Sequence, residues 1–376
     1  PHWPGNLKQY RLGIVGGALT TGDADGAEAT NPSTGFVAEC VRSYWTTTDT
    51  YWSFRPATNC DVGTAAERAA RAQSNNPDGD LTEKGAQAQV LRSLSPASRN
   101  MKTCNTFTCP TTPTVLPNFN DANTSLTAAA LGAADATERT ALINYQRGAD
   151  VNDEDTDGNL TEMRSSAHGD VIHSRPVAVN YGTDASPQVV VFYGGNDGVL
   201  RAVNGNRDTA VNSVAAGQEI WSFVPPEFFG SIKRLKTNSP KVRFVMIDDL
   251  PEYSDADATN DPQPKAYGLD GSVIAHKYGT STWIYSTARR GGRVVYAFDV
   301  SNINTDSSSP RVLWKVGCPN LGNDTGCTTG FSGIGQTWSA PKVLKAAGYG
   351  GGTSPMVIFG GGYDNCEDND PHTCTS

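Results

Sequence analysis

One stretch decides the fold class: QVVVFYGGNDGVLRAVNG (residues 188–205), followed by GQEIWSFVPPE (residues 217–227). An apolar run rich in β-branched residues leads into a turn of Gly, Asn and Asp, and a second alternating run follows. This order is typical of a β-hairpin. A third run then carries Trp221. The stretch therefore predicts a meander of short antiparallel strands.

The same order of runs and turns returns further along the chain. A second copy is STWIYSTARRGGRVVYAFDVS (281–301), and the RVLWKVG that follows it places Trp314 where the first copy has Trp221. A third copy begins at SPMVIFGGGYDN (354–365). Such repeats are typical of β-propeller blades, where a Trp packs between neighbouring blades. We predict a mostly β fold, a modified β-propeller whose last blade is incomplete; an antiparallel sandwich with coincidental spacing is the alternative.

Composition agrees with a fold of many turns. The chain has 376 residues, including 39 Gly and 22 Pro, and only 18% are charged. Its net charge of −9 disfavours nucleic acid as a partner, because phosphate backbones are anionic. The longest apolar runs, Val189–Tyr193 and Phe244–Ile247, have the length of strands, so we predict no membrane-spanning segment. Because the chain begins at Pro1 without a signal peptide, we expect a processed or excised start.

Three segments differ in composition, and we expect them to form one structural domain. Residues 1–60 predict the first propeller strands, residues 61–165 a partly helical, loop-rich insertion of Ala, Asn and Thr, and residues 166–376 the propeller blades. In the first segment we predict strands at Leu7–Val15, Phe36–Trp45 and Thr50–Phe54. In the insertion we predict helices at Thr64–Gln73, Glu83–Leu94 and Ala136–Arg147, and a loop at Thr103–Asn123.

Eight cysteines fall into four local groups, each in a polar, turn-rich segment. None forms a CxxC pair, which weakens the zinc-site and thioredoxin-like interpretations. Local disulfides formed in an oxidising compartment are the simplest explanation, and free thiols in a cytosolic protein are the alternative. The predicted pairs are Cys40–Cys60, Cys104–Cys109, Cys318–Cys327 and Cys366–Cys374.

The sharpest motif is DEDTDGN, residues 153–159. Its alternating acids place several hard oxygens inside one tight loop, Gly158 makes the turn, and Arg164 stands where a calcium loop has its last Glu. Glu162 is close enough to replace that ligand. The motif predicts a Ca²⁺ site, and a solvated acidic turn is the alternative. The predicted ligands are Asp153, Asp155, Asp157, the backbone carbonyl of Asn159, and Thr161 or Glu162.

Other polar clusters are weaker candidates for a site. We interpret two further acidic stretches as polar turns. A third set of residues, two His and one Asp, does not share one face of a strand, so a structural hydrogen-bonding role is favoured over metal binding. The chain has no GxSxG nucleophile elbow and no recognisable triad setting, so no catalytic residue is predicted. The first acidic stretch contains Asp23, Asp25, Gly26 and Glu28, and the second contains Asp255, Asp257 and Asp261. The third set is His168, Asp170 and His173.

A series of phrases spread in order over nearly the whole chain resembles one protein family. They are WPGNLKQYRLG (3–13), TGFVAECVRSYW (34–45), PDGDLTEKGAQAQVLR (77–92), HGDVIHSRPVAVNYG (168–182), VFYGGNDGVLRAVNG (191–205), GGRVVYAFDVS (291–301), GIGQTWSAPKV (333–343) and VIFGGGYDNCED (357–368). The family is PilY/PilC, the type IV pilus tip-associated biogenesis proteins and adhesins. The resemblance depends on the number and the order of these phrases rather than on any single one of them.

The resemblance implies a modified β-propeller that forms the C-terminal part of a large exported protein. Such proteins act with minor pilins in pilus assembly, oppose retraction and contribute to attachment to host or abiotic surfaces. It also implies a calcium-binding loop in the propeller and a place at the pilus tip or cell surface. An enzyme is not expected. The alternative is a secreted quinoprotein-like dehydrogenase, whose quinone site typically uses adjacent cysteines, and this chain has none.

Overall fold

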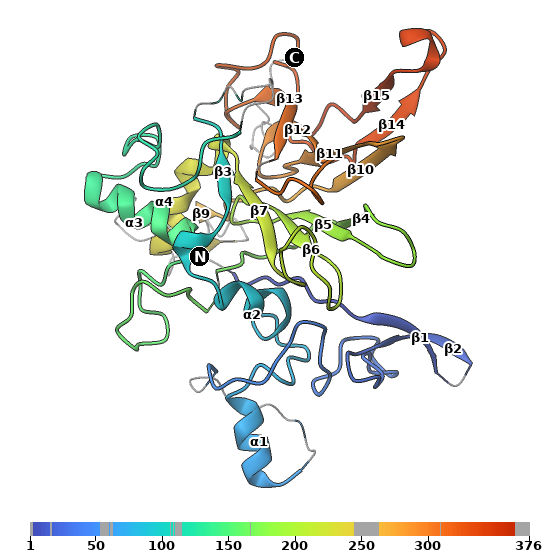
Figure 1. Ribbon diagram of the computed structural model, residues 1–376. Helices are drawn as coiled ribbons and strands as arrows, with labels where there is room; N and C mark the ends of the chain where they lie inside the picture. Colours follow the sequence, from blue (N-terminus) through green and yellow to red (C-terminus); the bar gives the residue numbers. More distant parts are fainter. Residues whose placement is uncertain are drawn as a thin grey trace, which may run out of the picture.

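The computed structural model has more strand than helix, 27% against 14%, so the predicted mostly β class is confirmed (Figure 1). Its strands form several separate sheets, and no closed ring of blades is found among the described residues. The structure describes residues 3–15, 17–52, 60, 63–105, 107, 109, 115–165, 167–243, 263–308 and 310–364.

The first repeat forms the central sheet, in which four strands make the predicted antiparallel meander. A fifth strand, from the insertion, pairs in parallel with the last strand of the meander. The order is β3-β7-β6-β5-β4. The strands are β3 (Met101–Thr103), β4 (Val177–Asn180), β5 (Val189–Gly194), β6 (Leu200–Asn204) and β7 (Glu219–Val224).

The second repeat forms most of a four-stranded antiparallel sheet in the order β10-β11-β12-β13, and the third supplies one strand of a hairpin that projects from the molecule (Figure 1). The strands of the sheet are β10 (Val273–Tyr278), β11 (Ser281–Thr287), β12 (Arg293–Asp299) and β13 (Arg311–Cys318). The hairpin pairs β14 (Lys342–Lys345) with β15 (Pro355–Ile358).

One hydrophobic core joins the two larger sheets. Trp221 on β7 is 1% exposed, and its ring lies 5.9 Å from that of Phe192 on β5 and 6.5 Å from that of Phe298 on β12. Phe223 on β7 also contacts Phe298, with ring centroids 5.2 Å apart. Aromatic rings bury large apolar areas, so this contact is a main source of stability between the sheets.

The three helices of the insertion lie within the predicted ranges: α1 (Ala65–Ala72), α2 (Ala86–Arg92) and α3 (Ala136–Gln146). Thr64 and Glu67 form a capping box at the start of α1, and the Asp135 carboxylate caps α3. A fourth helix, α4 (Phe229–Thr237), was not predicted, because the strand signal and two prolines precede it. It packs with α3 in a second core.

The N-terminal segment differs from the prediction. Among its described residues, the strands are those of one hairpin, β1 (Arg11–Val15) and β2 (Ala18–Gly22). The predicted strand at Phe36–Trp45 is wrong: it has a single bridge, between Val37 and Thr30, because its polar groups bond to distant loops. The predicted strand at Thr50–Phe54 lies partly outside the described residues. The remaining short elements are β8 (Val242–Arg243), β9 (Gln263–Pro264), η1 (Pro96–Ser98), η2 (Pro226–Phe228) and η4 (Gly350–Gly352).

Three of the four predicted disulfides are present: Cys40–Cys60, Cys104–Cys109 and Cys318–Cys327. The fourth predicted pair, Cys366–Cys374, lies outside the described residues. Among the residues described, no helix combines the length and the hydrophobicity needed to cross a membrane.

Candidate functional site

The acidic loop, residues 150–162, follows α3 and is closed at its base by backbone pairing. Ala149 and Met163 form an antiparallel bridge, and the Asp150 N–H donates to the Glu162 carbonyl at 2.9 Å. The Arg164 N–H donates to the Gly148 carbonyl at 2.9 Å. Paired ends fix the span of the loop, so its acidic side chains are confined to a small volume.

Two groups of carboxylates meet in this loop. Oxygen atoms of Asp153, Asp155 and Asp157 lie within 4.8 Å of one another, and so do those of Asp150, Asp155 and Glu162. Asp155 therefore belongs to both groups. The structure brings together four of the predicted ligands and adds Asp150, which the motif did not include. Only the bridge at the base of the loop could have indicated it, because that bridge places Asp150 opposite Glu162.

Backbone turns direct the carboxylates inward. The Gly158 N–H donates to Asp153 Oδ1 at 2.9 Å, and the Asn159 N–H donates to Asp157 Oδ1 at 2.7 Å. Gly158 has a φ of +84°, which a residue with a Cβ adopts only with strain. The predicted role of Gly158 as the turn residue agrees with this geometry.

The side chains of Asn159, Thr161 and Arg164 have partners within the acidic loop or beside it. Asn159 Nδ2 donates to Glu162 Oε2 at 3.1 Å, and the Thr161 hydroxyl donates to Asn159 Oδ1 at 2.9 Å. Arg164, at the position of the missing acid, donates to the Tyr145 carbonyl and lies 3.8 Å from the Glu154 carboxylate. The Arg164 guanidinium thus lies next to the acidic loop and supplies positive charge there.

The loop concentrates negative charge. Burial raises the pKa of Glu162, and the carboxylates of Asp157, Asp155 and Asp150 raise it further. Burial likewise raises the pKa of Asp150, and Asp155 adds to that effect. A bound cation would reverse both shifts, because it favours the charged form of each carboxyl group. Hard oxygens in this number suit a divalent cation of the Ca²⁺ type.

The weaker candidate at Asp23, Asp25, Gly26 and Glu28 does not form such a group. Asp23 accepts backbone N–H groups of Asp25 and Ala27 at 2.9 and 2.8 Å, and Asp25 pairs with Arg42, as in a polar turn. The candidate at Asp255, Asp257 and Asp261 lies outside the described residues.

The predicted structural role of the two histidines agrees with their contacts. His168 is buried, with Nε2 2.7 Å from the Tyr193 hydroxyl. His173 Nδ1 lies 2.7 Å from Asp270 Oδ2, whereas Asp170 bonds to Asn196 and Lys265. The three residues thus have separate partners rather than one shared centre.

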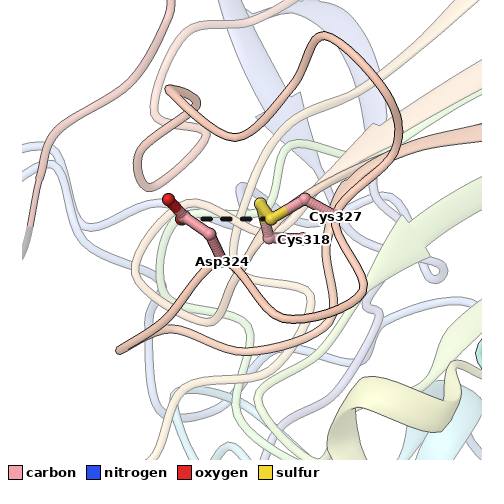
Figure 2. Close-up of side chains that lie close together, drawn as sticks. All are labelled: Cys318, Asp324 and Cys327. Atoms are coloured by element: carbon pink, nitrogen blue, oxygen red, sulfur yellow. Dashed lines mark hydrogen bonds between the residues drawn. A yellow bond between two sulfur atoms is a disulfide. The ribbon is translucent and has the colours of Figure 1, made fainter.

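Cys318, Asp324 and Cys327 also lie close together (Figure 2). Figure 2 shows the two sulfur atoms joined to each other. Asp324 Oδ1 lies 4.0 Å from the Cys327 sulfur. A disulfide offers no thiolate, and the thiolate is the form of Cys that binds metals. This group therefore fastens a loop to the end of β13.

Comparison of the chain with protein-family models, with curated proteins and with solved structures found no match.

Proposed function

We propose that this chain is a calcium-binding scaffold and adhesin domain at the tip of a type IV pilus, with roles in pilus assembly, retraction control and surface attachment. One observation supports the calcium part of the proposal: two clusters of carboxylates share Asp155 in a loop that is closed at its base. The pilus part rests on the resemblance of the quoted phrases to the PilY/PilC family. Minor pilins and a host or abiotic surface are the partners that follow from it.

The two meanders and the hairpin support the proposal of a modified β-propeller. The two meanders arise largely from the first two copies of the repeat, each with a strand, a Gly-rich turn and a second strand, and the third copy supplies β15. In this proposal they are blades of the propeller. The three disulfides are compatible with export to the cell surface, because such bonds persist in oxidising compartments.

In the proposed site one Ca²⁺ is held by the carboxylates of the acidic loop. Asp153, Asp155 and Asp157 supply three of them, and Glu162 and Asp150 belong to the second cluster that contains Asp155. The Asn159 carbonyl and the Thr161 hydroxyl remain candidates for the rest of the shell. Six to eight oxygens in a flexible arrangement is the coordination that Ca²⁺ takes in proteins. The ion would fasten the end of α3 to the segment that enters the central sheet.

We expect Asp155→Asn to abolish the rise in Tm that calcium causes, because Asp155 contributes to both carboxylate groups. In the unmodified protein, calcium at about 100 times its Kd should add about 2.7 kcal/mol to the free energy of unfolding. Calorimetric titration and thermal unfolding with and without calcium measure both effects. Asp184→Asn, at an exposed acid outside the loop, is the control and should keep the full response. Equal calcium binding by both variants would remove the loop from consideration.

We expect the gain in Tm from calcium to be largest near neutral pH and to shrink below about pH 5. The folded-state pKa values of Asp150 and Glu162 are raised. Without a cation, the stability that these two groups contribute is therefore present in acid and is lost as pH rises through those pKa values. Bound calcium offsets this loss of stability. As pH falls, protons compete with calcium for the carboxylates. Thermal scans between pH 4 and 8 test the trend, and a gain that did not depend on pH would contradict carboxylate ligation.

A further inference from the structure

A pocket of about 480 Å³ opens beside the acidic loop. Three segments that are distant in sequence form it: the irregular segment 45–51, helix α2 and its C-terminal cap, and the last residues of the acidic loop. Its volume lies within the range of small-ligand sites. The lining residues that the argument uses are Trp45, Asp49, Gln89, Val90, Arg92 and Glu162.

The polar wall of the pocket is held in place by a dense set of hydrogen bonds. Asp49 accepts from the Tyr51 N–H and from Gln89 Nε2, at 3.3 and 3.1 Å, and pairs with Arg92 Nη2 at 3.3 Å. Gln89 also exchanges hydrogen bonds with the Thr47 backbone at 2.9 and 3.0 Å. Because these groups are already ordered, a ligand would not have to pay the entropy of ordering them.

Aromatic rings and one unpaired donor add to this wall. Trp45 is anchored by its Nε1, which donates to the Asn206 carbonyl at 2.8 Å, and its ring packs against Gly217. The Arg92 guanidinium lies 3.8 Å from the centroid of the Tyr51 ring. Its side chain is 8% exposed, and its Nη1 has no hydrogen-bond partner among the described residues. Nη1 is itself buried, so a ligand oxygen that accepted from it would have to displace part of the wall.

The charges of the pocket select against anionic ligands. Arg92 and Asp49 pair with each other, which leaves Glu162 as the carboxylate with spare acceptor capacity. An anion would meet Glu162 and the acidic loop beside it. A neutral ligand with several hydroxyl groups avoids this conflict, because its O–H groups donate to a carboxylate and its oxygens accept from Arg92.

We propose that this pocket binds a neutral saccharide unit. A pyranose ring offers hydroxyl groups for Glu162 and Arg92 on its edge and apolar C–H groups on its face, and Trp45 presents an aromatic surface for the latter. As the ligand class of an adhesin, the proposal rests on the function proposed above. Binding to the pocket itself is measured on the purified chain, without pili.

The test uses the methyl glycosides of glucose, galactose, mannose and N-acetylglucosamine as probes at millimolar concentration. Saturation-transfer NMR and titration of Trp fluorescence should detect binding of at least one of them. Val90→Trp, which places a bulky ring at the pocket wall, should weaken that binding at least tenfold. Ala66→Trp, at an exposed position of α1 outside the pocket, should leave it unchanged.

Several outcomes would overturn the proposal. These are the absence of binding by every probe, unchanged binding in a folded Val90→Trp variant, or preferential binding of methylamine or N-acetylneuraminic acid, which would indicate a site for ions. Near-UV circular dichroism and the Tm of each variant show whether it is folded. Val90→Trp should keep the calcium response and Asp155→Asn should lose it, so failure of the pocket and failure of the calcium site are separate results.

Discussion

Replacing Arg201 by Met is expected to lower the free energy of unfolding by about 3–5 kcal/mol. Arg201 on β6 is 0% exposed, and its guanidinium pairs with the Asp197 carboxylate and lies 3.8 Å from Glu219. Met keeps much of the volume but removes the charge. The Asp197 carboxylate would then remain buried without its main partner, which costs far more than the loss of an exposed pair.

The protonation state of Asp197 shows why the pair matters. Burial alone would raise the pKa of this carboxyl group, but the Arg201 guanidinium outweighs burial and lowers the pKa below its ordinary value. For an acid with a lowered folded-state pKa, the stabilisation is present at neutral pH and is lost as pH falls through that value. We therefore expect the difference between the Arg201→Met variant and the unmodified protein to narrow in strong acid.

Denaturant unfolding at pH 7 measures the effect, and Arg311→Met is the matched control. Arg311 forms an exposed pair with Asp299 at 3.3 Å, with 47% of the Arg311 side chain exposed. Exposed pairs contribute about 0–1 kcal/mol. If the two variants lost similar amounts of unfolding free energy, the Arg201 network would stabilise the sheet no more than a surface ion pair does.

Replacing Trp221 by Ala is expected to cost about 3–5 kcal/mol, the range for large aromatic residues in cores. Trp221 joins the two larger sheets through Phe192 and Phe298, so the cavity would open where the sheets meet. The midpoint of denaturant unfolding and the near-UV circular dichroism signal are the measurements. A loss of cooperativity would indicate that the sheets had come apart.

Trp314→Ala is the control for this prediction, because Trp314 holds the equivalent place in the second repeat. It is only half-buried, and its ring packs against Tyr285 at 5.8 Å. A smaller cavity and some contact with solvent should reduce the cost to well below that of Trp221→Ala. If both variants lost equal stability, the two tryptophans would be equivalent and the unequal burial would not matter.

The sequence by itself determined the local features of this protein. Alternation of apolar residues and the Gly-rich turns predicted the two meanders, and helical patterns in the sequence predicted the three helices of the insertion. The spacing of Asp153, Asp155 and Asp157 predicted that their carboxylates would meet. Each of these depends on neighbours a few residues apart, whose relative positions are set by backbone geometry.

Only the tertiary structure decided features that join distant segments. Asp150 enters the acidic loop through the pairing at its base, and Arg92 meets Asp49 across 43 residues to build the wall of the pocket. The segment Phe36–Trp45 has the composition of a strand, yet its polar groups bond to loops such as that of Asp78 instead. Packing also made Trp221 a core residue and left Trp314 half-buried. Local sequence does not contain these outcomes, because burial and long-range pairing depend on which surfaces the folded chain brings together.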